Sequence, residues 1–353
     1  MYKKFFMGIA AMAALTLVSC SSDDLNSLSD NSSKNEAISF DSYLGRSAVA
    51  VNGSRGSVET LDQLKTDAFG VFGNYSKDAT TTYGENLFKN QMVTYDKTKS
   101  KWTYTPYKYW LSEGHIDFLA YAPYDATKKT LTDSKSKIGF TVLSTIAEQK
   151  DLLWANAKNQ TQANKTVTFT FNHALSRLGY TVKLKEDCSN DVTITLKSIT
   201  LAGSTDDAPK GAFYTSGTID LSKANKEDGL WPVHEGKQKF DWFSGDYIVK
   251  KSTASHPTNP DSKTDYLFVI PQDFSKSEPD ADKLYVIVKY EIKYNDIPGA
   301  TVTNTVNKEL PYNFEQGKAY TINLTIGRPI DFDVNTVITP WVDDTTIPEI
   351  PMD

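Results

Sequence analysis

The sequence has few of the residues that carry covalent or metal chemistry. Among its 353 residues are two cysteines, Cys20 and Cys188, and four histidines. The histidines lie far apart and none belongs to an HExxH or His-x-His arrangement, so a zinc signature is missing. GxSxG, GxGxxG and Walker A motifs are missing as well. We therefore expect a protein that is not an enzyme and that uses neither a cofactor nor a metal.

Long apolar runs are equally scarce. The run at residues 8–18 follows Lys3 and Lys4 and is 11 residues long, with Thr16 as its polar member. A helix that crosses a bilayer needs about 20 apolar residues, so this length and basic flank indicate a secretory signal peptide over residues 1–19. No later segment of the sequence is apolar enough to span a membrane.

The apolar run ends at Leu17-Val18-Ser19-Cys20, which resembles a bacterial lipobox. The resemblance implies that Cys20 is lipidated and anchors the mature chain in outer-membrane lipid; the alternative is a plain signal peptide with an incidental cysteine. Residues 20–36 are mostly polar, and we expect them to form a flexible tether. Their first residues, Ser-Ser-Asp-Asp after the cysteine, are similar to signals that send lipoproteins of Bacteroides-like bacteria to the outer face of the outer membrane.

Positive charge and disulfides are also limited. The formal net charge is −6, and a chain that begins at Cys20 loses Lys3 and Lys4 and carries −8. This balance argues against nucleic acid as a partner. With Cys20 used for lipid, Cys188 has no intrachain partner, so an exported chain must rely on its apolar core for stability.

What the sequence has in quantity is aromatic residues, with 19 Tyr, 17 Phe and 6 Trp, together with many Thr and Val. Short alternating or apolar runs, such as TVTFTF at 166–171, recur between clusters of turn residues. This pattern predicts an all-β fold of sandwich type. Two stretches, 58–64 and 147–154, are candidates for short helices.

The mature chain is long enough for two ordinary domains. Residues 158–165 (KNQTQANK) are polar and loop-like, and a β-rich run follows them. We place the boundary near residue 170, which gives an N-terminal domain over 37–170 and a C-terminal domain over 171–353.

Several side chains have both a structural and a functional interpretation. The carboxylate pairs at 206–207 and 343–344 could be the acid and base of a glycosidase, but we favour their interpretation as solvated surface pairs. His173 follows a strand-like run, which favours a structural histidine. The aromatic residues between 102 and 110 are favoured as core residues, although they could also stack on a sugar.

Several stretches along the chain form a recognisable set through their order and spacing. They are 38–40 (ISF), 44–48 (LGRSA), Trp110, 118–124 (FLAYAPY), 151–155 (DLLWA), 169–178 (FTFNHALSRL) and 314–320 (FEQGKAY). As a set they resemble the fimbrillin family of Bacteroidales, and the resemblance covers nearly the whole mature chain. It implies two tandem transthyretin-like β-sandwich domains and a structural pilin that polymerises with identical or related subunits by strand exchange after proteolysis.

Strand exchange would involve two regions of the sequence, and the first is the start of the N-terminal domain. Ile38, Phe40 and Tyr43 are expected to present an apolar face of an exchangeable first strand. Arg46, in a Gly-Arg-Ser stretch, and Arg55 are candidate sites for an arginine-specific protease that needs an exposed loop. A cut after either arginine would free the strand and leave an unpaired groove. The alternative is an ordinary first strand with two loop arginines that are not cut.

The second region that strand exchange would involve is the C-terminus. Apolar residues alternate with Asp and Asn from Ile330 to Val334 and continue after a break in phase, which predicts a strand over 330–341 with one apolar face. Pro340 suits an edge strand or a strand end. This strand is a candidate donor to a neighbouring subunit, or it completes its own domain. Its candidate donor residues are Ile330, Phe332, Val334, Val337, Ile338 and Trp341.

The sequence carries candidates for a lipid anchor, a groove and a donor strand, so a stalk subunit is the first interpretation, ahead of a tip or an anchor. The alternative from another class is a monomeric surface lipoprotein that binds glycan through exposed aromatic residues. Adhesion and colonisation are the roles that the resemblance implies.

Overall fold

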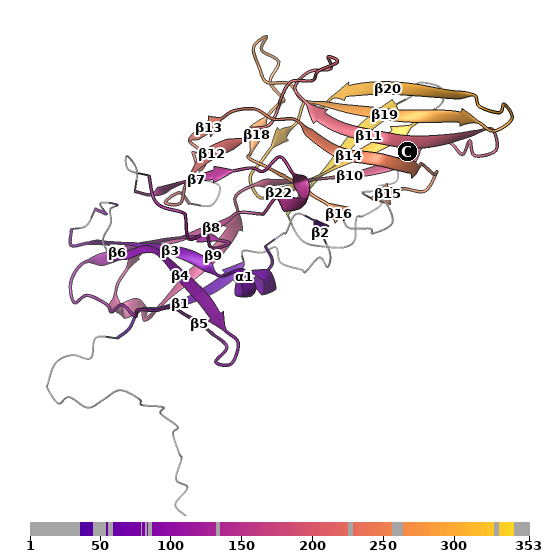
Figure 1. Cartoon of the computed structure of the whole chain (residues 1–353). Helices are drawn as coiled ribbons and strands as arrows, with labels where there is room; N and C mark the ends of the chain where they lie inside the picture. Colours follow the sequence, from indigo (N-terminus) through magenta and orange to yellow (C-terminus); the bar gives the residue numbers. More distant parts are fainter. Residues whose placement is uncertain are drawn as a thin grey trace, which may run out of the picture. The chain divides into compact units, whose positions relative to one another are not determined.

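The computed structural model of the chain describes residues 36–44, 54–55, 59–78, 80–81, 83, 87–131, 135–224, 229–255, 264–327 and 332–341. Within these ranges the chain is almost entirely β-structure, in two main groups of strands (Figure 1). The predicted all-β fold built from β-sandwich domains is therefore confirmed.

The first group is a seven-stranded sheet with the strand order β1-β9-β8-β6-β3-β4-β5. Most neighbours are antiparallel, whereas β1 and β9 are parallel. β9 shows why the alternating sequence forms a half-buried strand, since Val167, Phe169 and Phe171 are buried and the threonines between them are exposed. The strands are β1 (Ser39–Leu44), β3 (Phe69–Ser76), β4 (Phe88–Asp96), β5 (Lys101–Thr103), β6 (His115–Ala122), β8 (Leu153–Gln160) and β9 (Thr166–His173).

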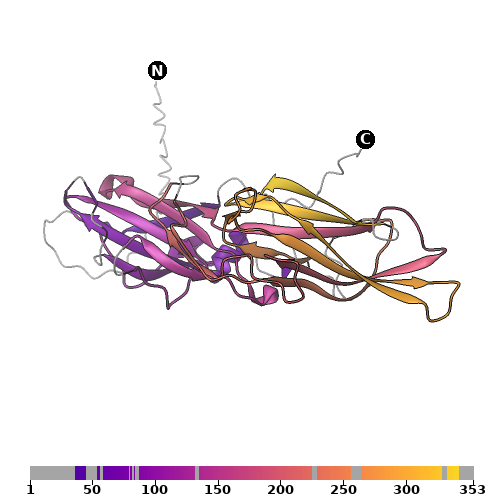
Figure 2. The same cartoon turned by 90° about the horizontal axis from the view of Figure 1, so that it is seen from above.

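The second group consists of two sheets that share one apolar core (Figure 2). One has the order β15-β10-β22-β23, with β17 also paired to β10, and the other has the order β14-β11-β19-β20. β10 and β22 are parallel, and the other pairs in these sheets are antiparallel. The strands are β10 (Ser176–Leu184), β11 (Val192–Ala202), β14 (Phe240–Ile248), β15 (Ala254–Ser255), β17 (Leu267–Val269), β19 (Tyr285–Tyr294), β20 (Thr301–Glu309), β22 (Lys318–Ile326) and β23 (Phe332–Pro340).

Shorter ladders join parts of the chain that are far apart in sequence. β7 (Lys137–Thr141) pairs with β12 (Ser216–Asp220), which also pairs with β13 (Val233–Glu235). β2 (Ser54–Arg55) pairs with β16 (Thr264–Asp265), and β18 (Gln272–Asp273) pairs with β21 (Asn313–Phe314). β7 and β12 lie on opposite sides of the boundary expected near residue 170, and β9 runs three residues past it. The boundary remains a prediction.

The helical content is small. Helix α1 (Leu61–Asp67) begins where the Gln63 N–H donates to the Thr60 hydroxyl at 3.1 Å, an N-cap that fits one of the two expected helices. The other expectation is wrong: between 147 and 154 the chain forms the end of a 3₁₀ turn (Ile146–Glu148) and enters β8. Leu152, Leu153 and Trp154 are all buried, so this apolar run fills the core from an extended backbone.

Phe213 is completely buried in the core of the second group. Its ring centroid lies 5.7 Å from Phe240, 5.5 Å from Phe274 and 6.2 Å from Phe314. We expect Phe213→Ala to lower the free energy of unfolding by about 3–5 kcal/mol, because a large cavity replaces these contacts. Ile297→Ala, at a side chain that is 53% exposed, should change it by less than about 0.5 kcal/mol. Urea unfolding of both variants measures this, and equal losses would contradict it.

Candidate strand-exchange site

Strand β1 lies at the end of the seven-stranded order, where it is hydrogen-bonded to β9 alone within the sheet. The parallel register runs from Ser39 opposite Thr166 to Leu44 opposite Phe171. Just before the strand, the Ile38 N–H donates to the Lys108 carbonyl at 2.8 Å and the Tyr104 hydroxyl donates to the Ile38 carbonyl at 2.8 Å. Removal of β1 would therefore leave one side of β9 without a partner.

The side chains of β1 that face inward complete an aromatic core. Ile38 and Phe40 are 1% and 5% exposed. The Phe40 ring centroid lies 5.4–5.7 Å from the centroids of four other rings, which come from three strands of the sheet and the loop after β5: Phe88, Tyr104, Phe118 and Phe169. β1 thus fills a site in the core although it is bonded to the sheet along one edge.

Tyr43 does not share this face. Its side chain is 54% exposed, and its hydroxyl donates to the Asp41 carboxylate at 3.0 Å. The expectation that it extends the apolar face is wrong, because alternation along the strand carries that face from Ile38 through Phe40 to Ser42. Ser42, which is 5% exposed, occupies the third inward position.

The predicted processing sites are only partly within the described residues. Cys20, Arg46 and Ile330 lie outside them. Arg55 is the second residue of β2, and its backbone pairs with Asp265 of β16. The sequence-based role of each of these residues remains a prediction.

Strand β23 forms the outer edge of its sheet and pairs with β22 without a bulge, from Phe332 opposite Ile326 to Pro340 opposite Lys318. The ladder therefore continues without a bulge through the break in phase of the apolar residues, which places Val337 on the face opposite Phe332 and Val334. Pro340 is both in an edge strand and at a strand end, as its missing N–H requires. In this structure β23 completes its own sheet, which is one of the two alternatives expected for it.

The apolar side chains of β23 are buried to different degrees. Phe332 and Val334 are half-buried against the core of the second group, and Val337 is half-buried as well. Ile338 is 51% exposed. Trp341, the residue after the strand, is 1% exposed.

Trp341 lies among residues from both groups of strands. Its ring system is stacked on the His173 imidazole, with centroids 4.0 Å apart and planes 8° apart, and on Phe268 at 5.6 Å and 14°. The Arg177 guanidinium carbon lies 5.1 Å from the Trp341 ring centroid. His173 is thus a structural residue at the end of β9, as its sequence context indicated.

His173 is held in place by a buried carboxylate. Its Nδ1 atom lies 2.7 Å from Oδ2 of Asp151, which is 1% exposed. The same oxygen accepts a hydrogen bond from the Glu59 N–H at 3.3 Å. Asp151 therefore joins the segment before α1 to the histidine on which Trp341 stacks.

The side chain of Glu59 is completely buried, and its carboxyl group lies beside that of Asp67. Burial, followed by the nearby carboxyl group of Asp67, raises the pKa of Glu59 to about 9. Glu59 is therefore protonated at neutral pH. Sequence reasoning missed this group, because nothing in the local pattern distinguishes a buried glutamate at the start of a helix from an exposed one.

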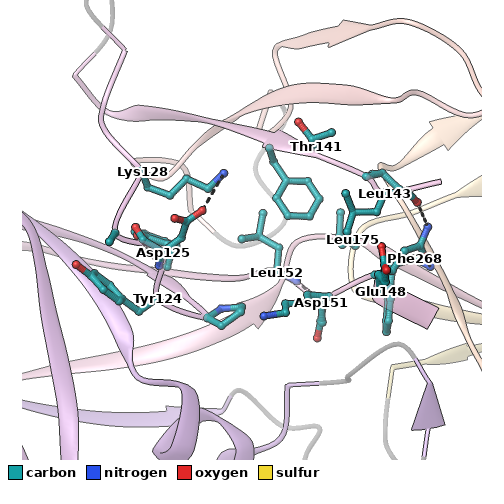
Figure 3. A pocket seen from close by; sticks show the side chains of 17 residues that line it. Tyr124, Asp125, Lys128, Thr141, Leu143, Glu148, Asp151, Leu152, Leu175 and Phe268 are labelled. Atoms are coloured by element: carbon teal, nitrogen blue, oxygen red, sulfur yellow. Dashed lines mark hydrogen bonds and ion pairs between the residues drawn. The ribbon is translucent and has the colours of Figure 1, made fainter. Parts of the chain in front are cut away.

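Figure 3 shows a cavity of about 550 Å³ that shares Phe268 and Asp151 with the surroundings of Trp341 and His173. Asp151, Leu175 and Phe268 line it, and Leu152 points into it. At the far side of the cavity the Lys128 Nζ atom lies 4.0 Å from Oδ2 of Asp125 and donates a hydrogen bond to the Gly139 carbonyl at 2.8 Å. Lys128 and Asp125 therefore already have partners within the chain.

The aromatic segment at 102–110 divides into two kinds of residue. Trp102, Tyr104 and Trp110 are buried, as favoured from the sequence. Tyr107 and Tyr109 are 58% and 48% exposed and are the members of this segment left for contact with a ligand.

Within the described ranges, no helix has the length and apolar character that a membrane crossing requires. The described side chains also contain no cluster of three or more His, Cys, Asp or Glu residues suited to a metal ion.

Comparison with known proteins gives three concordant findings. A family model described as fimbrillin-like matches residues 58–341. The fimbrium subunit Fim1C of Phocaeicola vulgatus is 27% identical over 380 aligned residues, which cover 96% of this chain and 96% of that protein. The crystal structure of a fimbrial protein from Bacteroides vulgatus has a TM-score of 0.61 at 21% identity, with 87% of this chain and 100% of that chain covered.

The two faces of β1 provide a matched pair of substitutions. We expect Phe40→Ala to lower the free energy of unfolding by about 3–5 kcal/mol, because it empties a position among four aromatic rings. Tyr43→Ala should lower it by less than about 0.5 kcal/mol, because that side chain faces water. Chemical denaturation of the uncleaved chain tests this, and a larger loss for Tyr43→Ala would overturn the assignment of the faces.

Glu59 should make stability depend on pH. Its pKa is about 9 in the folded chain against 4.5 without the fold, so the folded state loses stability as pH rises between these values. We expect Glu59→Gln to remove that loss and to raise the free energy of unfolding at pH 7 by up to about 3 kcal/mol, with the difference vanishing below pH 4.

The measurement is urea unfolding of both proteins from pH 4 to pH 9. Asp62→Asn, at a side chain that is 87% exposed in the first turn of α1, is the control. Parallel pH profiles for the wild type and Glu59→Gln would show that the glutamate is ionised in the fold.

Proposed function

The chain belongs to the fimbrillin-like family, and on this premise we propose that it is a structural subunit of a surface fimbrium that assembles by strand exchange. Its partners are other pilin subunits, identical or related. The observation that carries the proposal is β1, which fills an aromatic core site while it is bonded to the sheet along one edge.

In the proposed sequence of events, the precursor is exported and lipidated at Cys20, which anchors it in outer-membrane lipid. An arginine-specific protease then cuts after Arg46 or Arg55. Both arginines follow β1, so either cut separates this strand from the rest of the chain. Arg46 is the favoured site, because a protease takes its substrate as a free extended segment and the Arg55 backbone is paired with β16.

Loss of β1 would open a groove along β9. The groove would expose unpaired backbone groups together with the site of Phe40, so it would favour the binding of a new apolar strand. β23 has suitable chemistry, because Phe332 and Val334 lie on one face and alternate with Asp333 and Asn335 on the other. We propose that β23 of one subunit enters the groove of the next.

The position of the subunit in the fimbrium follows from which elements it uses. A stalk subunit uses both the groove and the donor strand, a tip subunit uses the groove, and an anchor keeps its lipid and donates. We propose a stalk subunit that serves adhesion. The exposed Tyr107 and Tyr109 favour glycan binding as the second candidate function.

The proposal predicts different effects for the two faces of β23. Lipid-free precursor treated with a low amount of trypsin should acquire a new N-terminus at Ser47 or Gly56 and then form ladders that resist denaturant in unboiled electrophoresis. The double variant Phe332→Ser/Val334→Ser should be cut normally but form no ladder. The control Asp333→Ser/Asn335→Ser, on the outward face, should form ladders as the wild type does.

Ladders from both double variants would contradict donation by β23. Arg46→Gln and Arg55→Gln identify the cut. A chain that loses β1 and stays monomeric would point to a tip role, and one that resists trypsin and binds immobilised glycan through Tyr107 and Tyr109 would favour the second function.

A further inference from the structure

Strand β23 is weakly buried along its length but firmly buried at its end. Its half-buried residues Phe332, Val334 and Val337 lie in an edge strand, and Ile338 is 51% exposed. Trp341 is 1% exposed and belongs to the core of the second group. The tryptophan therefore buries more of its side chain than any other residue between Phe332 and Trp341.

The contacts of Trp341 are with residues distant from β23 in sequence. It is stacked on His173, at the end of β9, and on Phe268 of β17, and the guanidinium of Arg177 in β10 lies over its ring. Its backbone N–H donates to the Gly317 carbonyl at 3.3 Å. These contacts hold the end of the strand on elements that would remain in place if β23 left β22.

The indole itself is bound by ring contacts. Its Nε1 atom is buried and has no hydrogen-bond partner among the described residues. A tryptophan that leaves this position gives up stacking and apolar burial, while its N–H gains a hydrogen bond to water. Ring contacts and apolar burial therefore hold Trp341 in place, and its release lets the indole N–H bond to water.

The stacking surface is fixed by the first group of strands. His173 is oriented by its 2.7 Å contact with Asp151, and Asp151 also accepts hydrogen bonds from the N–H groups of Glu59 and Leu152 at 3.3 and 2.8 Å. The imidazole is thus held by a carboxylate that two backbone N–H groups anchor. This rigidity preserves the near-parallel stacking on Trp341.

We propose that Trp341 is an intramolecular latch: it holds β23 on its own chain and limits the release of this strand for exchange. The inference rests on the proposed role of β23 as a donor. The latch is an autoinhibitory contact, because a subunit whose donor strand is retained cannot fill the groove of a neighbour. His173 is a positioning residue of the latch, and Asp151 acts through it.

Hydrogen exchange of the uncleaved, lipid-free precursor measures the latch without assembly. In Trp341→Ala, the amides of β23 that bond to β22 should exchange about 100-fold faster than in the wild type, since loss of a buried tryptophan favours the open strand by roughly that factor. Ile338→Ala, in the same strand, is the matched control and should change their exchange by less than about 3-fold. The amides of β11 and β19 report on global unfolding, which the loss of a buried tryptophan also favours, so they should accelerate as well but remain slower than the β23 amides in both proteins.

Unchanged exchange in β23 would overturn the latch, because the strand would then open while Trp341 stayed buried. Exchange of β23 at the rate of β11 and β19 in both proteins would also overturn it, because the strand would then open only on global unfolding. Trp341→Phe keeps a ring against His173 and should give an intermediate rate, which preserves the test if Trp341→Ala does not fold. His173→Ala should raise β23 exchange in the same direction as Trp341→Ala, and no rise there would remove its positioning role.

Assembly separates the latch from the donor role. If trypsin-treated Trp341→Ala forms ladders faster than the wild type, both proposals are supported. If the wild type forms ladders and the variant forms them no faster, the latch does not limit release and is overturned, while the donor role stands. If β23 exchanges faster in the variant and no protein forms a ladder, the contact is local to the monomer and the donor role fails.

Discussion

An edge strand leaves half of its backbone hydrogen-bonding groups without a partner, and this fold places a strand from near each end of the chain at such an edge. β1 closes one end of the seven-stranded sheet, and β23 closes one end of a sheet in the second group. Each contributes inward side chains to an apolar core while one of its backbone edges faces away from the sheet. The neighbours of these two strands, β9 and β22, are each paired on their other side with an inner strand, β8 and β10 respectively.

Sequence patterns predicted the parts of the fold that depend on local periodicity. The alternation at 166–171 became β9, and the apolar Ile38 and Phe40 point into the core of the first group. The errors arose where the period was misjudged. Tyr43 stands an odd number of positions from Phe40 and so faces water, and the stretch at 147–154 has apolar residues in succession because they enter a buried strand rather than a helix.

The contacts around Asp151 were beyond the reach of such patterns. His173 and Trp341 are 168 positions apart in the sequence, and Glu59 lies 92 positions before Asp151. Stacking and burial at this range are set by how the sheets pack, and no periodic signal records them. The roles proposed for Cys20, Arg46, Arg55 and the donor strand concern processing and assembly, which a single chain in its own fold does not display.

The parallel pairing of β10 with β22 also constrains how quickly the second group can form. Its register pairs Arg177 with Ala319, 142 positions later. β1 likewise cannot pair until β9 is available, and β9 begins more than 120 positions after it. Pairings between residues so far apart in sequence form slowly, because the entropic cost of closing a long loop precedes any stabilising contact. A chain that emerges from its N-terminus therefore leaves the β22 side of β10 unpaired until nearly all of it is available, and the last strands set when the fold can close.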